Sequence, residues 1–151
     1  MIVALDASPL SLLTQRHGIA EADECRKWAE SLVLAGARIV IPSITDYEVR
    51  RELLRAGKTT SVGRLDALRS SPAFEFLPIT DTALVRAAIL WADARNRGLP
   101  TAAPAELDCD VVMVAILQTS NLPLADITIA TTNVGHLSRF LPAQHWRAIA
   151  L

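Results

Sequence analysis

The alternation of short apolar runs with longer segments of helical periodicity is the feature that most constrains the fold. The apolar runs, of which Ile2–Asp6 is the first, are rich in β-branched and aliphatic residues and are typical of buried strands. Between them, apolar residues recur at three- and four-residue steps, as in Ala22, Cys25, Ala29 and Leu32. Strands separated by helices imply parallel pairing with helices on both faces. We therefore predict a three-layer α/β/α sandwich around a mostly parallel sheet of four to five strands.

Individual elements follow from the same pattern. No repeat, low-complexity tract or linker interrupts the sequence, so residues 1–151 are expected to form a single domain. The segment Pro100–Leu107 contains two prolines and predicts a loop. The remaining predicted strands are Arg38–Ile41, Phe74–Ile79, Ile127–Thr131 and an edge strand at Trp146–Ile149, and the predicted helices are Glu21–Ala35, Ile44 to about Ala56, Thr60–Ser70, a helix capped by Thr80 or Asp81 that ends before Gly98, and Asp110–Thr119.

Composition and charge limit the class of protein. Hydrophobic residues make up 51% of the chain and charged residues 21%, which argues against disorder. The apolar runs are too short to span a membrane, and Cys25 and Cys109 suit free thiols in a reducing compartment, so we expect a cytoplasmic protein. The net charge of −1 does not favour a non-specific nucleic-acid binder. A local basic segment is either a solvated helix face or a substrate-facing patch, and it comprises Arg50, Arg51, Arg55, Lys58, Arg64 and Arg69.

Acidic and amide side chains lie where the predicted strands end or the next helices begin. Asp6 ends the first strand, Glu48 lies early in the helix after the second, Asp110 opens an apolar helix, and Asn133 follows the strand Ile127–Thr131. Taken singly, Asp6 could form a turn, Asp110 could cap its helix, Asn133 could form an Asx turn, and Glu48 could pair with an arginine on its own helix. In a parallel sheet, however, all of these positions converge at one edge.

Convergence of several carboxylates requires a counter-charge. Two carboxylates about 4 Å apart repel by roughly 4 kcal/mol at an effective dielectric constant of 20. A hard divalent cation offsets that repulsion, and Mg²⁺ or Mn²⁺ suits oxygen ligands, whereas the few His and Cys residues disfavour structural zinc. Such a site can orient and deprotonate water for phosphoryl displacement. No Gly-rich phosphate-binding loop is present to support a nucleotide-binding function instead.

Four segments, in order, resemble the motifs of the PIN-domain family, which includes the VapC-type toxins of bacterial toxin–antitoxin pairs. The segments are LDASPL, PSITDYEVRREL, DVVMVAIL and IATTNVGHLSRF, which contain Asp6, Glu48, Asp110 and Asn133 respectively. Together they span nearly the whole chain. The resemblance implies a metal-dependent endoribonuclease of PIN-like fold, with Mg²⁺ or Mn²⁺ as cofactor and RNA as substrate. It also implies a homodimer and a cognate antitoxin protein that blocks the site.

The resemblance assigns roles residue by residue. Asp6, Glu48 and Asp110 would be the catalytic, metal-binding acids. Asp108 would be an auxiliary acid or a polar loop residue, and the Ser8 hydroxyl would order a metal-bound water or a phosphate. Asn133 stands where some members of the family have Asp. His136 stands where others have Asp, so the fourth acid is missing and the second metal position should be weaker.

Three hypotheses follow from these assignments. The first is a metal-dependent ribonuclease, acting as a toxin, with Arg50, Arg51 and Arg55 as RNA-binding residues. The second is a PIN-like module that binds RNA or protein and no longer cleaves, as the change at Asn133 allows. The third is a small phosphatase or other metal-dependent hydrolase that uses the same acids.

Overall fold

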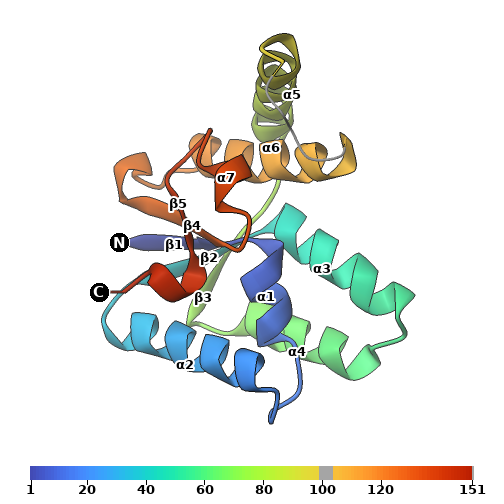
Figure 1. Ribbon diagram of the computed structural model, residues 1–151, viewed down its shortest axis with the longest axis vertical. Helices are drawn as coiled ribbons and strands as arrows, with labels where there is room; N and C mark the ends of the chain where they lie inside the picture. Colours follow the sequence, from blue (N-terminus) through green and yellow to red (C-terminus); the bar gives the residue numbers. More distant parts are fainter. Residues whose placement is uncertain (99–103, 151) are drawn as a thin grey trace.

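A parallel sheet of five strands forms the centre of the molecule. The computed structural model describes residues 1–98 and 104–150, and the side chains of these residues apart from 104–106. The strand order is β3-β2-β1-β4-β5, and every neighbouring pair is parallel. This arrangement confirms the predicted α/β/α fold class (Figure 1). The strands are β1 (Ile2–Leu5), β2 (Arg38–Pro42), β3 (Phe74–Leu77), β4 (Ile127–Thr131) and β5 (Ala143–His145).

Helices connect the strands and cover both faces of the sheet (Figure 1). Among the described residues, no helix is long and apolar enough to cross a membrane. The helices are α1 (Ala7–Leu13), α2 (Ala20–Leu34), α3 (Ser43–Arg55), α4 (Thr59–Ser70), α5 (Asp81–Asn96), α6 (Pro104–Thr119) and α7 (Val134–Leu137), with short 3₁₀ turns η1 (Leu124–Asp126) and η2 (Trp146–Ala148).

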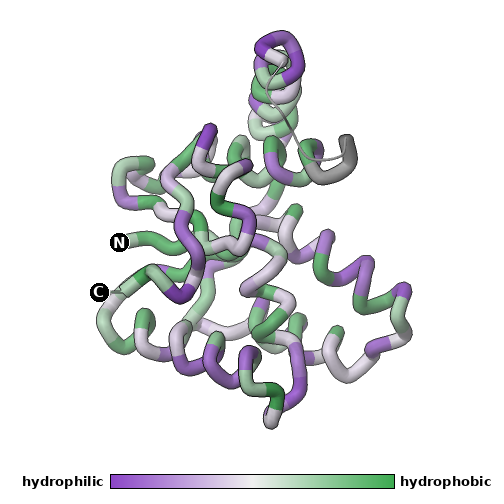
Figure 2. Tube along the Cα trace, viewed as in Figure 1, coloured by the Kyte–Doolittle hydropathy of each residue, from purple (hydrophilic) through white to green (hydrophobic). Residues whose placement is uncertain are grey.

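Successive side chains of a strand point to alternate faces of the sheet, and this divides the core into two layers. In β1, Ile2 and Ala4 pack with α5 and α6, whereas Val3 and Leu5 pack on the opposite face with residues of α1 to α4. Successive strand side chains point to opposite faces, and both faces here are covered by helices, so β1 is apolar throughout. Figure 2 shows the central strands mostly at the hydrophobic end of the colour scale, with purple concentrated on the helices.

Three sequence-based predictions are wrong in detail. The edge strand is Ala143–His145, and Trp146, predicted to start a strand, begins η2, with its ring buried against the core. The predicted loop Pro100–Leu107 lies partly outside the described residues, and its last four residues are helical because α6 begins at Pro104. Proline is tolerated in the first turn of a helix, where its missing N–H would have no partner. Asp110 is therefore within α6 and does not open it.

The order of the strands creates a switch point beside β1. The chain proceeds from β1 to β2 and β3 on one side, and then returns to place β4 on the other side of β1. Connections leave the carboxyl ends of β1 and β4 in opposite directions, which leaves a crevice at that edge in open parallel sheets. Asp6 directly follows β1, and Thr132 and Asn133 directly follow β4. The fold thus brings the first and last predicted site residues to the same edge.

Candidate functional site

Asp6 is the N-cap of α1 and is fixed by bonds to two elements. Its Oδ1 accepts a hydrogen bond from the backbone N–H of Ala7 at 2.7 Å. Its Oδ2 accepts a hydrogen bond from the Thr131 hydroxyl at 2.6 Å, and Thr131 is the last, fully buried residue of β4. The backbone N–H of Asp6 also donates to the carbonyl of Ala130. These bonds hold the carboxylate between the ends of the two central strands.

Thr131 links Asp6 to the segment after β4. Besides donating to Asp6, its Oγ1 accepts a hydrogen bond from the backbone N–H of Asn133 at 2.8 Å. The Ser8 hydroxyl accepts from the backbone N–H of Thr132 at 3.1 Å, so Ser8 ties the first turn of α1 to the same segment. From the sequence, Thr131 is only the last residue of a predicted strand. The available signal was its position, two residues before Asn133 at the end of a strand that neighbours Asp6.

The environment of Asp6 disfavours its charged form. Burial raises the pKa of the Asp6 carboxyl above its usual value, and the bonds from Thr131 and Ala7 counteract only part of that effect. Both hydrogen-bond donors are neutral, so neither supplies the positive charge that a buried carboxylate requires. A bound cation would supply that charge. The charged form of Asp6 is thus held at a cost in stability.

Acids of α3 and α6 act on a buried thiol, that of Cys109. Cys109 of α6 has its pKa raised to about 11, first by burial and then by the negative charge of Glu48, while Arg51 opposes the shift. Asp110 acts in the same direction as Glu48. Helices α3 and α6 pack against each other, and Glu48 and Arg51 of α3 are close enough to Cys109 of α6 to act on its thiol. The raised pKa also agrees with a thiol that is not a nucleophile.

The donor atoms at this edge suit a hard cation, although the acids do not form a closed cage. Asp6, Glu48 and Asp110 supply carboxylate oxygens only, which is the ligand chemistry of Mg²⁺ and Mn²⁺. Two buried hydroxyl oxygens at the start of α3, those of Ser43 and Thr45, have no hydrogen-bond partner among the described residues. Within those residues, no three His, Cys, Asp or Glu side chains are grouped closely enough to hold a metal ion.

Asn133 forms a pair with the other residue that departs from an acid. Its Nδ2 lies 3.0 Å from Nδ1 of His136, so the amide donates when that imidazole nitrogen is unprotonated. The two residues are three apart and belong to the short α7 region. The Asn133 amide is therefore paired with an imidazole at this edge.

We call the edge of the sheet where Asp6, Glu48 and Asp110 are predicted to converge the acidic edge. Asp108 lies on a different side of α6 from this edge. It is exposed, and it lines a shallow apolar hollow with Leu84 and Trp91 of α5 and with Val111. Residues two apart in a helix point in widely different directions. Asp108 is thus a helical residue facing α5, and the alternative that it is a polar loop residue is wrong.

The three arginines predicted to bind RNA differ in their contacts. Arg50 donates to both oxygens of Asp46, at 2.9 and 3.1 Å, and to Asp66 of α4 at 2.8 Å. Asp46 is buried, so Arg50 joins α3 to α4 as the counter-charge of an interior carboxylate. Arg55 pairs with the exposed Glu52. Arg51 lies over the ring of Tyr47 and near Glu48, next to the acidic edge.

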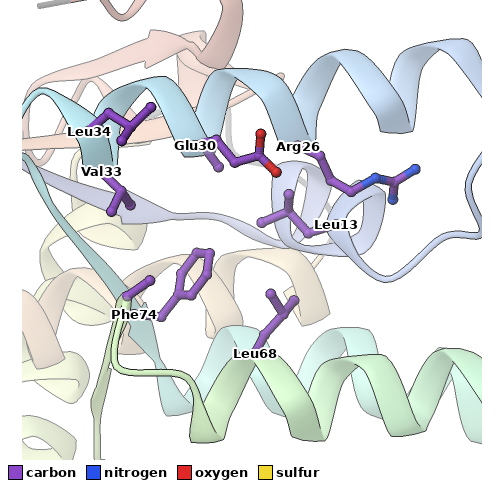
Figure 3. Close-up of a pocket in the computed structure, with 9 residues that line it drawn as sticks. Leu13, Arg26, Glu30, Val33, Leu34, Leu68 and Phe74 are labelled. Atoms are coloured by element: carbon purple, nitrogen blue, oxygen red, sulfur yellow. The ribbon is translucent and has the colours of Figure 1, made fainter.

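An apolar groove lies outside the acidic edge. It has a volume of about 500 Å³ and is lined mainly by apolar residues of α2, α4 and the start of β3. Figure 3 shows Val33 of α2, Leu68 of α4 and Phe74 of β3 directed toward one another across it. Leu34, at the end of α2, is 88% exposed beside it. None of the predicted site acids lines this groove, so it is separate from the candidate site.

Comparison with known proteins identifies the family and the fold. The PIN domain family model matches residues 3–131. No curated protein matches the sequence. A chain of VapBC2 from Rickettsia felis, in a crystal structure bound to a DNA fragment from the promoter, has a TM-score of 0.69 and 19% identity, covering 97% of this chain and 99% of that one. A chain of VapBC-1 from nontypeable Haemophilus influenzae has a TM-score of 0.59 and 17% identity, with the same coverages.

Proposed function

The chain belongs to the PIN-domain family, and from this premise we propose that it is a metal-dependent endoribonuclease that hydrolyses RNA phosphodiesters. The observation that carries the proposal is the half-buried Asp6 carboxylate at the switch point of the sheet. Within the part of the chain that the structure describes, its hydrogen-bond donors are neutral, and its pKa is raised. A carboxylate held in this way suits a divalent cation. PIN domains are typically nucleases, which agrees with that chemistry.

We assign the metal to Asp6, Glu48 and Asp110. A bound Mg²⁺ or Mn²⁺ would lower the pKa of water and stabilise the charge of an in-line phosphoryl displacement. Thr131 fixes the orientation of Asp6, because its hydroxyl bond holds one carboxylate oxygen and leaves the other lone pairs available. Ser8 and Asn133 flank the same edge as auxiliary polar groups. Arg51 offers a cation to an RNA phosphate beside Glu48.

RNA cleavage by alanine variants tests the proposal. The parent protein with Mn²⁺ should cut a fluorescently labelled single-stranded RNA, and EDTA should abolish the cleavage. Asp6→Ala and Glu48→Ala should each reduce the rate by at least about 100-fold, in the range found when a group that stabilises transition-state charge is removed. The matched control is Asp126→Ala, since Asp126 is exposed and precedes β4 at the opposite edge of the sheet. Cleavage that persists in Asp6→Ala would refute the assignment.

A second candidate is a PIN-like module that binds RNA or protein without cleaving it. The pairing of Asn133 with His136 favours it, because an amide and an imidazole stand where members of the family have an acid. That module would bind RNA with an affinity unaffected by EDTA and by Asp6→Asn. The nuclease would instead lose Mn²⁺-dependent stabilisation in Asp6→Asn.

We further propose that the nuclease is the toxin of a toxin–antitoxin pair, with a cognate antitoxin protein as its inhibitor. Support comes from the family, which includes the VapC toxins, and from the VapBC assemblies that share the fold. Its site of action would be the cytoplasm, which contains RNA and keeps buried cysteines such as Cys25 and Cys109 reduced. Co-expression with the product of an adjacent reading frame should relieve the growth arrest that the active chain causes alone.

A homodimer through α5 completes the proposal. Helix α5 exposes Leu84 (48%), Val85 (65%), Ile89 (48%) and Trp91 (39%), of which Leu84 and Trp91 lie beside the hollow that α5 shares with α6. An acid, Asp81, begins the helix and a base, Arg95, lies in its last turn. Two copies of α5 packed antiparallel about a twofold axis would pair these opposite charges and bury both apolar stripes. A second copy of the chain is thus the occupant that matches this surface.

A further inference from the structure

A basic hollow separates the end of α1 from the start of α4. Its volume is about 530 Å³, and three cationic side chains from two distant parts of the sequence line it: Arg16, Lys58 and Arg64. Hydroxyl side chains at residues 59–61 form another part of its wall. No carboxylate is among the described residues that line the hollow. A concave surface of one charge sign concentrates field lines, and so attracts ligands of the opposite sign.

These three cations have no ion-pair partner among the residues that the structure describes, unlike Arg26 and Arg50. Nearby acids already have partners, because Asp66 binds Arg50 and Asp23 binds Arg26. The hollow therefore retains its charge in a chain whose net charge is only −1.

One of the cations is held in place by the protein itself. The Arg64 guanidinium donates through Nη1 to the carbonyl of Thr14 at 3.2 Å, and Thr14 is fully buried at the end of α1. The remaining N–H groups of Arg64 stay available to another acceptor. A planar guanidinium fixed in this way is suited to a phosphate, which it can bind through two parallel hydrogen bonds. Lys58 and Arg16 would add point charges on either side.

Helix α1 connects this hollow to the acidic edge. Asp6 caps its N-terminus, and Arg16 follows its C-terminus after a short turn. The seven residues of α1 rise about 10 Å at 1.5 Å per residue. A stacked nucleic-acid strand covers that length in roughly three nucleotides, at about 3.4 Å per nucleotide. One RNA chain is long enough to reach both places.

We propose that this hollow binds a backbone phosphate of the RNA substrate, a few nucleotides from the bond that is cut. The inference rests on the proposed function and adds to it the surface that holds the substrate. It also reassigns the basic segment of the sequence. Arg50 and Arg55 have acidic partners, whereas Lys58 and Arg64 of the same segment meet Arg16 at an unpaired site.

The salt dependence of RNA binding tests this inference. The background is Asp6→Asn, so that bound RNA is not cut, and the test variant adds Arg16→Gln, Lys58→Gln and Arg64→Gln. Each lost phosphate contact on a single strand lowers the slope of log K against log salt concentration by about 0.7. The triple change removes the three cations around one phosphate, so it should reduce the slope by about 0.7 and weaken the affinity at 0.1 M salt by roughly fivefold.

The matched control removes the same charge elsewhere. Arg38, Arg86 and Arg97 have partners outside the hollow, and changing all three to Gln should leave the slope within about 0.2 of the background value. An equal loss of slope in the control would show that only net charge matters, and would overturn the inference. Thermal unfolding of both triple variants checks that each is folded under the binding conditions.

Two further ligands identify what the hollow recognises. Inorganic phosphate tests for a site for free phosphate, and an oligoglutamate peptide of the same charge as the RNA tests for an acidic protein segment. If the triple variant loses affinity for either of these ligands but keeps its affinity for RNA, the inference is overturned. If Asp6→Asn does not bind RNA at all, the proposed function and this inference both fail. If the parent protein cuts RNA and the triple variant keeps its slope, only this inference fails.

Discussion

The carboxyl group of Asp6 is subject to two opposing influences. Burial raises its pKa, whereas bonds from Thr131 and Ala7 lower it, and burial is the larger effect. In the unfolded chain the group has its ordinary pKa of 3.8. Between that value and the raised pKa the folded state binds more protons, so the stability of the fold decreases as the pH rises through this interval. At neutral pH, where the group is charged in the unfolded chain, the folded protein bears the full penalty.

Asp6→Asn should therefore make the protein more stable at pH 7.5 while removing its activity. The neutral amide retains an acceptor for Ala7 and avoids the charge, so we expect a gain of about 1 kcal/mol, or roughly 2–4 °C in Tm. Thermal unfolding from pH 3 to pH 8 measures it. The gain should disappear below about pH 3.8, where both chains are neutral at this position. A variant less stable than the parent at pH 7.5 would contradict this reading of the site.

Metal binding should make the parent protein more stable than Asp6→Asn, which is the reverse of the order expected without metal. A cation at 100 times its Kd stabilises the folded state by about 2.7 kcal/mol. Mn²⁺ should therefore raise the Tm of the parent protein and leave that of Asp6→Asn nearly unchanged. Ca²⁺ and EDTA serve as comparison conditions in the same experiment. An equal Mn²⁺ shift in both proteins would place the metal away from Asp6.

Asn133 determines how much negative charge the acidic edge has. Asn133→Asp should strengthen Mn²⁺ binding, because it adds a carboxylate at the end of β4 beside the Thr131–Asp6 pair. We expect at least a fivefold lower Kd for Mn²⁺ by isothermal titration calorimetry, equivalent to about 1 kcal/mol. Asn133→Ala is the control, since it removes the amide oxygen without adding charge. Unchanged affinity in Asn133→Asp would show that this position faces away from the metal.

At the scale of elements, α3 depends on one buried ion pair. Arg50→Gln should destabilise the fold, because it leaves the buried Asp46 carboxylate without its counter-charge and removes the link to Asp66. We expect a loss of about 2–3 kcal/mol, or roughly 5–10 °C in Tm. Arg55→Gln breaks an exposed pair and should change stability by no more than about 0.5 kcal/mol. Urea denaturation of both variants compares them directly.

That comparison also separates two roles for the arginines of α3. If Arg50 mainly binds RNA, Arg50→Gln will be as stable as the parent and will bind RNA weakly. The bidentate contact with Asp46 leads us to expect the opposite. Of Arg50, Arg51 and Arg55, Arg51 lies beside Glu48. Replacing Arg51 should weaken RNA binding without reducing the stability of the fold.

At the scale of the whole molecule, α5 determines assembly. It protrudes at one end of the molecule (Figure 1), and it buries Ala83, Ala87, Leu90 and Ala94 while Val85 and Ile89 are exposed. Ile89→Asp should convert a dimer to a monomer, because it places a charge in the apolar stripe without disturbing the buried face. Light scattering coupled to size exclusion measures the mass. Leu124→Asp, at an exposed leucine of η1, should remain dimeric, and a monomeric parent would refute the α5 interface.

The fold was easier to predict from the sequence than the site, because strands and helices follow local patterns whereas the site depends on contacts between distant residues. The strands and long helices follow from periodicity, since burial on both faces requires apolar runs such as Ile2–Leu5. Helix α1 was missed because its seven residues contain a proline and offer little periodicity, and its start depends on the capping bond of Asp6. The position of Asp110 was misjudged because proline in the segment before it suggested a loop, although proline also begins helices.

The amino-acid sequence by itself determined the layered α/β architecture and the order of acids along the chain, because hydrophobic periodicity and strand ends are local properties. Only the tertiary structure decided which polar groups meet. It joined Thr131 to Asp6, 125 residues apart, and Arg50 to Asp66, and it left Arg16, Lys58 and Arg64 together without acids. Such pairings depend on the strand order and on the packing of helices, which bring together residues that no local pattern relates.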